Sequence, residues 1–149
     1  MTLFILMTVG LQAMEPAIAK AGASSEKPLM TPEPGYGMVY IVREVGRHPQ
    51  FRFDVYLDEA VLKERIGYTL GGQYIYFQVP AGKHRVVSVG KNTKTIPFDI
   101  KGGETIFIKQ AEKWDPKDGS NQDVLEILSP ETAQYVLKHA VKGWIDEKE

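Results

Sequence analysis

The chain has 149 residues, 43% of them hydrophobic and 25% charged, which is the size and composition of one globular domain. Its net charge of −1 excludes a global basic surface, so no nucleic-acid partner is predicted. The absence of cysteine excludes disulfides, thiolate metal sites and thiol catalysis.

The amino terminus predicts export. Leu3–Ala13 is an apolar run as long as a signal-peptide core and too short to span a bilayer, which takes about 20 helical residues. Small residues that suit cleavage follow, so residues 1–21 are interpreted as a signal peptide and the location as periplasmic or secreted. No Lys or Arg precedes the run, and the alternative is a buried strand or helix. Membrane contact is expected only through an uncleaved segment.

Residues 22–36 are predicted to be a flexible linker, because they are mostly small, polar or proline. Such a composition buries too little apolar surface to order itself. A proline-rich ligand motif is the alternative interpretation, although Pro28, Pro32 and Pro34 form no clean repeat.

Residues 37–129 are predicted to form the β-sandwich domain. Met38–Val45 is apolar on both faces at its start, which suits an interior strand. Phe51–Leu57 and Tyr74–Val79 alternate apolar and polar side chains, as half-buried antiparallel strands do. Lys63–Leu70 is expected to be a short or bulged strand.

Turn residues separate the later strands. Pro80–Lys83 predicts a tight reversal, and Pro97 predicts an edge strand because proline lacks an amide donor. Short strands at regular intervals predict an all-β fold, an antiparallel β-sandwich of about seven to eight strands with one C-terminal amphipathic helix. The remaining strands are expected at His84–Val89, Thr95–Ile100, Thr105–Gln110 and Asp123–Leu128, with a polar loop at Asp115–Gln122.

Residues 130–149 are predicted to be a helix and tail. Ser129 suits the N-cap, Pro130 the first helical position, and Gly143 the end of a helix of about three to four turns. This helix is expected either to cover an open sheet face or edge or to bind a partner or a membrane surface. Its polar face carries charges of both signs and is not basic, which favours covering the sheet. Its apolar stripe is Ala133, Val136, Leu137, Ala140 and Val141.

Four segments together resemble a known group of proteins: Phe53–Asp58, Ile66–Gly67, Tyr74–His84 and Gly103–Gln110. They are similar to the small bacterial proteins grouped as Domain of Unknown Function 2846, which are akin to PEGA-type modules with a strand, V-P-x-G-x-H, strand pattern. The resemblance spans about Met38–Leu128. It implies a compact, exported antiparallel sandwich, often a lipoprotein, with no established catalytic residues. This chain departs from the lipoprotein members because it has no cysteine.

No catalytic, metal-binding or cofactor-binding residue is predicted. The three histidines lack metal-ligand spacing, and Pro116 falls where a calcium loop at Asp115–Asp123 needs a ligand. Ser88 and Ser120 lack the G-x-S-x-G elbow of hydrolases.

Candidate ligand-binding residues are aromatic. Tyr56, Tyr74 and Tyr76 fall at the polar, outward-facing positions of alternating strands that are expected to be neighbours. Trp114 precedes the polar loop. Exposed rings of this kind stack on sugars or anchor a peptide. The alternative is that they are ordinary cross-strand residues or are covered by the helix.

The preferred hypothesis is therefore a non-enzymatic binding or structural module of the bacterial envelope, whose partner is an envelope protein or a glycan. One rival is a hydrolytic enzyme with a site built from loops. The other is an assembly component that adds strands at the Pro97 edge.

Overall fold

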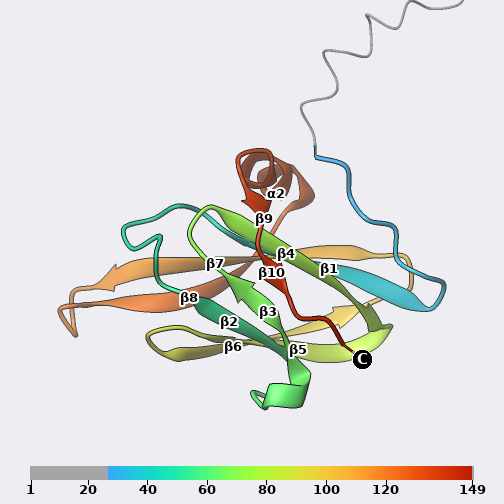
Figure 1. Cartoon of the computed structure of the whole chain (residues 1–149), viewed down its shortest axis with the longest axis horizontal. Coiled ribbons are helices and arrows are strands. Elements are labelled where there is room, and N and C mark those ends of the chain that lie inside the picture. Colours follow the sequence, from blue (N-terminus) through green and yellow to red (C-terminus); the bar gives the residue numbers. More distant parts are fainter. Residues whose placement is uncertain (1–26, 149) are drawn as a thin grey trace, which may run out of the picture.

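The computed structural model describes residues 27–148, so the signal-peptide interpretation and the start of the linker lie outside the described residues. Two five-stranded sheets face one another (Figure 1). Sheet A has the order β8-β7-β1-β4-β9, and sheet B has the order β10-β3-β2-β5-β6. The elements are β1 (Tyr36–Arg43), β2 (Phe53–Leu57), η1 (Leu62–Glu64), β3 (Arg65–Thr69), β4 (Gln73–Pro80), β5 (Gly82–Val89), β6 (Thr93–Ile100), β7 (Thr105–Asp115), β8 (Ser120–Leu128), α2 (Pro130–Leu137), β9 (Val141–Lys142) and β10 (Trp144–Ile145).

The predicted β-sandwich is confirmed. β1 lies in the middle of sheet A and is buried on both faces, as its continuous apolar run indicates. Its ladder with β7 is parallel, as is that of β4 with β9, whereas the other ladders are antiparallel. β6 is an edge strand, so the expectation from Pro97 is also confirmed.

The main core lies between the two sheets. Alternate residues of the longer strands point inward, as a two-residue period requires. The buried members are Val39, Ile41, Val55, Ile66, Ile75, Phe77, Val79, Val86, Phe98, Ile100 and Ile108. The strand expected at Phe51–Leu57 begins only at Phe53, and Phe51 is exposed, so the prediction that the alternating strand starts at Phe51 is wrong.

The outer face of sheet A carries a second apolar cluster, covered by α2 (Figure 1). Met38, Tyr40 and Val42 of β1 pack here against Val136 and Leu137 of the helix. The Ser129 side chain accepts a hydrogen bond from the Thr132 backbone N–H, as predicted for an N-cap. However, α2 spans only eight residues, about two turns, so the expected length is wrong.

The carboxy-terminal tail joins the two sheets. β9 pairs with β4 of sheet A, and after Gly143 the chain enters β10, which pairs with β3 of sheet B. Gly143 therefore links two edge strands and does not end the helix. Val141 lies in β9 and is exposed, so its assignment to the apolar stripe is wrong.

Residues Pro80–Lys83 reverse the chain between the sheets and not within a hairpin, because β4 belongs to sheet A and β5 to sheet B. His84 braces this crossing: its Nε2 donates to the carbonyl of Pro80 at 2.7 Å, and its Nδ1 lies 3.2 Å from Asp58 Oδ2. The turn motif therefore fixes the step from one layer to the other.

The polar loop expected at Asp115–Gln122 is shorter than predicted. β7 continues to Asp115 and β8 begins at Ser120, so the two strands form a long ribbon (Figure 1). No helix among residues 27–148 is long and apolar enough to cross a membrane.

Gly67 is required for the docking of β10. A Cβ atom at this position would lie 2.0 Å from the carbonyl oxygen of Trp144. We predict that Gly67→Ala lowers the free energy of unfolding by about 1–3 kcal/mol, because backbone must shift to relieve the clash. Gly102→Ala is the matched control, since the nearest atoms there are 3.7 Å away. Urea unfolding of both variants measures the difference; equal stabilities would contradict the assignment.

The tail should also respond to pH through Asp146. Arg65 donates hydrogen bonds of 2.6 and 3.1 Å to this carboxylate and holds its pKa below the usual value. The resulting stability is fully present above the unfolded pKa of about 3.9 and is lost as pH falls through the lower folded pKa.

We therefore predict that Asp146→Asn costs about 1 kcal/mol at neutral pH and that this difference shrinks below about pH 4. Urea unfolding at several pH values tests the effect, with Asp118→Asn on the exposed β7–β8 turn as control. A difference independent of pH would contradict a role for ionised Asp146.

Candidate functional site

Two of the predicted tyrosines come together, and the third does not. Tyr74 and Tyr76 lie on the outer face of sheet A, where their ring centroids are 6.2 and 5.5 Å from that of Tyr40. Tyr56 lies on β2 of sheet B, opposite Arg65 and Val87. The three rings therefore do not form one surface. All three side chains point outward, but β4 and β2 belong to different sheets, so they point to opposite sides of the sandwich.

The residues before β1 lie against the tyrosines of this face. The Met30 backbone N–H donates to Tyr40 Oη at 2.8 Å, and the Lys27 ammonium lies 4.4 Å from the centre of the Tyr74 ring. Burial raises the pKa of Tyr40 and of Tyr74. The described part of the predicted linker thus packs on the sheet, and both rings are only partly exposed.

The outer face of sheet B has no covering helix among the described residues (Figure 1). Tyr68 stacks with Trp144 at 6.3 Å between ring centroids, and the Arg52 guanidinium lies 4.2 Å from the centre of the Tyr68 ring. Sequence reasoning missed Tyr68 and Trp144, because nothing local to either residue shows that the tail returns beside β3. These rings are already stacked on one another and on arginine.

A buried arginine organises one end of the sandwich. Arg43, at the end of β1, is 3% exposed, and its guanidinium lies 3.8 Å from the centre of the Phe53 ring. It donates to the backbone carbonyls of His48, at 2.9 Å, and of Phe51. It also forms an ion pair with Glu112 at 3.5 Å. Burial lowers the pKa of Arg43, and the negative charge of Glu112 opposes that shift.

Further polar side chains continue this buried group between the sheets. Thr69 Oγ1 donates to Gln110 Oε1 at 2.5 Å, and Gln110 Nε2 donates to Ser88 Oγ at 2.8 Å. Each of these side chains therefore has a partner, which a polar group requires when it is removed from water. The row links β3, β5 and β7 and so fixes how the two sheets meet at this end.

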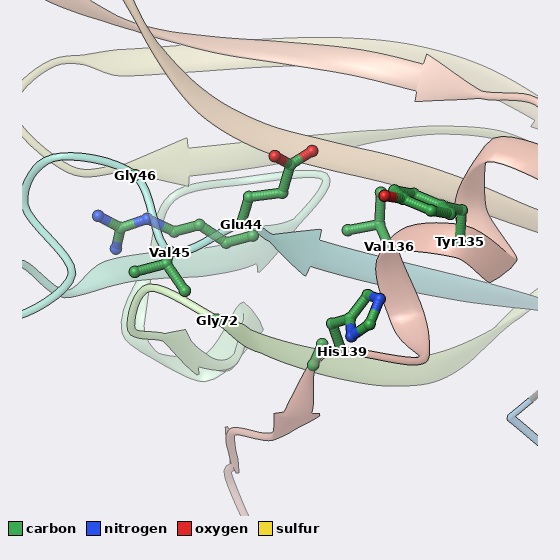
Figure 2. Close-up of a pocket in the computed structure, with 9 residues that line it drawn as sticks. Glu44, Val45, Gly46, Gly72, Tyr135, Val136 and His139 are labelled. Carbon is green, nitrogen blue, oxygen red and sulfur yellow. The ribbon is translucent and has the colours of Figure 1, made fainter.

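Two cavities flank the segment that follows Arg43. The first has a volume of about 300 Å³ and lies between this segment and the end of α2 (Figure 2). Figure 2 shows Tyr135 and His139 on the helix side and Glu44 and Val45 on the other. Glu44 is already paired with Lys109 at 2.8 Å, and the rings of Tyr135 and His139 meet edge to face.

The second cavity has a volume of about 450 Å³ and lies between the same segment and β7. Four basic and two acidic side chains line it, an excess of two positive charges. Trp114, one of the predicted binding residues, lines its wall and is 60% exposed. Arg47 and Lys113 also line it, and neither has an ion-pair partner among residues 27–148. We call this cavity the β7 cleft.

The histidines and the β7–β8 turn have structural contacts. His48 Nδ1 donates to Glu112 Oε2 at 2.8 Å, and the Lys117 backbone N–H donates to Asp115 Oδ1 at 2.8 Å. Within the described residues, no cluster of three or more His, Asp or Glu side chains is arranged to hold a metal ion. Sequence reasoning missed Arg43, Arg47 and Lys113 because isolated basic residues carry no motif.

Comparisons of this chain with models of protein families, with curated proteins and with solved structures found no match. The resemblance to Domain of Unknown Function 2846 therefore stays an untested prediction.

The Arg43–Glu112 pair should be critical for stability. We predict that Arg43→Met lowers the free energy of unfolding by about 3–5 kcal/mol, because it removes the donor to the carbonyls of His48 and Phe51 and leaves the Glu112 carboxylate with His48 as its remaining partner. Arg47→Met, at an exposed position four residues later, should change stability by less than about 0.5 kcal/mol. The double variant Arg43→Met/Glu112→Leu should recover part of the loss. Chemical denaturation measures all three, and equal effects of the two arginine variants would contradict this role.

Proposed function

We propose that the protein is a non-enzymatic, exported binding module of the bacterial envelope and that its binding site is the β7 cleft. The observation that carries the proposal is the exposed indole of Trp114 in a cavity of about 450 Å³ with excess positive charge. Clefts of about 300–1,000 Å³ are the usual size of binding sites. The partner is an envelope protein or a glycan.

Trp114 and Arg47 supply the chemistry of a binding surface. Tryptophan and arginine are the residues that most often carry the affinity of an interface, since each offers a large contact area with a polar group. A ring that is mostly exposed to water gains free energy when a partner covers it. Arg47 and Lys113, which have no ion-pair partner among residues 27–148, would favour a partner with negative charge.

Contacts within the protein hold both walls of the cleft. One wall is β7, which pairs with β8 as far as Asp115. The other is the segment after β1, which the Arg43 guanidinium holds through the carbonyls of His48 and Phe51. A site that is ordered before binding loses less conformational entropy when the partner arrives.

The export part of the proposal rests on the apolar run Leu3–Ala13 and the small residues that follow it. Membership of the bacterial Domain of Unknown Function 2846 group would agree with it and rests on the motifs quoted above. Mass spectrometry of the native protein from separated cell fractions tests both removal of residues 1–21 and the compartment. An intact chain in the cytoplasmic fraction would overturn the export proposal.

A hydrolytic enzyme with a loop-built site is the second candidate, because Glu44, His139 and Tyr135 line the first cavity (Figure 2). A carboxylate and an imidazole are groups that general acid–base catalysis uses. Glu44 already bonds to Lys109, however, and binding is the better-supported function. Hydrolytic turnover of a defined substrate, lost in His139→Ala, would favour the enzyme.

The chain contains two tryptophans with similar exposure, which gives a matched pair of variants. Trp114 is 60% exposed in the β7 cleft, and Trp144 is 56% exposed on β10. We predict that Trp114→Ala reduces partner binding by about tenfold or more, as truncation of a central aromatic contact does. Trp144→Ala should leave binding nearly unchanged.

The measurement is a pull-down from envelope extract together with a glycan array, each performed with both variants and the unchanged protein. Circular dichroism checks that the variants are folded. Equal binding by Trp114→Ala and the unchanged protein would contradict the β7 cleft as the site. Loss of binding only in Trp144→Ala would transfer the site to the outer face of sheet B.

A further inference from the structure

Part of β7, an inner strand of sheet A, has no neighbouring strand on one side among the described residues. β1 pairs with β7 only as far as the contact of Arg43 with Gln110, whereas β7 continues to Asp115. On its other side, β7 remains paired with β8 through that whole length. Within residues 27–148, no strand pairs with Ala111–Asp115 on the β1 side. Part of the backbone hydrogen-bonding capacity of β7 is therefore available there.

The β7 cleft lies against this open edge. Six consecutive residues of β7, from Lys109 to Trp114, line the cavity. Since successive side chains of a strand point to opposite faces, a cavity lined by consecutive residues follows the edge of the strand. Asn121 of β8, which pairs with Trp114, also lines the cavity, so the cavity reaches over one face of β7 as well. The cavity therefore adjoins the place where a longer β1 would have continued.

Contacts within the protein hold the segment that follows β1 in place. Gly46, three residues beyond the last residue of β1, has a φ of +61°, a left-handed conformation that glycine adopts readily. Arg43 then holds the following residues by bonding to the carbonyls of His48 and Phe51. The gap beside Ala111–Asp115 is consequently fixed by buried contacts.

Resting on the proposed function, we propose that the partner is an acidic protein that inserts an extended segment into the β7 cleft as an added strand beside Ala111–Asp115. Main-chain hydrogen bonds to an open edge supply affinity, and side chains beside the edge supply selectivity. Arg47 and Lys113 pair with acidic residues of the segment, and Trp114 packs on its apolar side chains. Charge complementarity selects this occupant over a neutral or basic segment.

The edge strand β6 is less suited to this role. Pro97 removes one amide donor from this strand. In addition, β6 already contacts β8 of the other sheet. β9 and β10 have only two residues each, so they offer little length for pairing. The β7 edge combines an adjoining cavity with five positions, Ala111–Asp115, that no strand of the described residues pairs on the β1 side.

The experiment uses the full chain carrying Trp144→Phe, so that Trp114 is its single tryptophan. The probe is the acetylated and amidated peptide Thr-Glu-Val-Glu-Val-Glu-Thr, titrated while indole fluorescence is followed. We expect saturable binding with a blue shift, because the segment excludes water from Trp114. Affinity should fall as salt rises, and Arg47→Glu/Lys113→Glu should weaken it by about tenfold or more.

Two N-methylated versions of the peptide, blocked on alternate sets of residues, test strand addition directly. A strand added at one edge uses the donors of one set only, so one version should lose binding and the other should keep it. Equal binding by both versions, or by a peptide with lysine in place of glutamate, would overturn the inference. An oligogalacturonate that binds more tightly than the peptide would overturn it in favour of an acidic glycan.

The two proposals fail in different ways. If no acidic peptide binds but Trp114→Ala still loses its partner in envelope extract, strand addition is wrong and the binding function stands. If neither the peptide nor any extract component or glycan distinguishes Trp114→Ala from the unchanged protein, both proposals are wrong.

Discussion

The contacts of the buried Arg43 guanidinium hold together this end of the sandwich. A charge removed from water must be matched, and the Arg43 group is matched by backbone carbonyls, by Glu112 and by the face of Phe53. These partners belong to β2, to β7 and to the segment between β1 and β2. One side chain therefore holds the segment that follows the central strand and connects the two sheets. The two cavities lie on opposite sides of that segment, one on each side.

The parts of the fold that follow from neighbouring residues could be predicted from the sequence. The alternation in β4 places Ile75, Phe77 and Val79 in the core, since the period of a strand is set by its own backbone. Pro97 indicates an edge strand because the missing donor is a property of the residue itself. The Ser129 cap forms for the same reason: its partner is three residues away.

The remaining parts depend on which segments meet, and local patterns do not contain that information. The residues of the Pro80–Lys83 turn suit any tight reversal, so they do not reveal that the chain changes sheets there. Tyr56 and Tyr76 have the same parity, yet the sandwich separates them. The early end of α2 follows from the pairing of β9 with β4, a contact with a strand more than sixty residues earlier. The sequence indicates Trp114 as a candidate aromatic but gives no sign of its cationic neighbours, because Arg47 reaches the β7 cleft only through the fold.

The position of the β7 cleft follows from unequal strand lengths and not from a catalytic motif. A sandwich whose strands all ended together would present closed ladders and a flat end. Here β7 and β8 extend beyond Arg43, so one strand edge opens beside a segment that carries Arg47. The outer face of sheet A is meanwhile occupied by α2 and by Lys27–Met30. The rings on sheet B stack on one another. Among the described aromatic candidates, Trp114 combines high exposure with a cavity and with cations that have no ion-pair partner among residues 27–148. This combination supports the proposal that a partner binds at the end of the sandwich and not on either face.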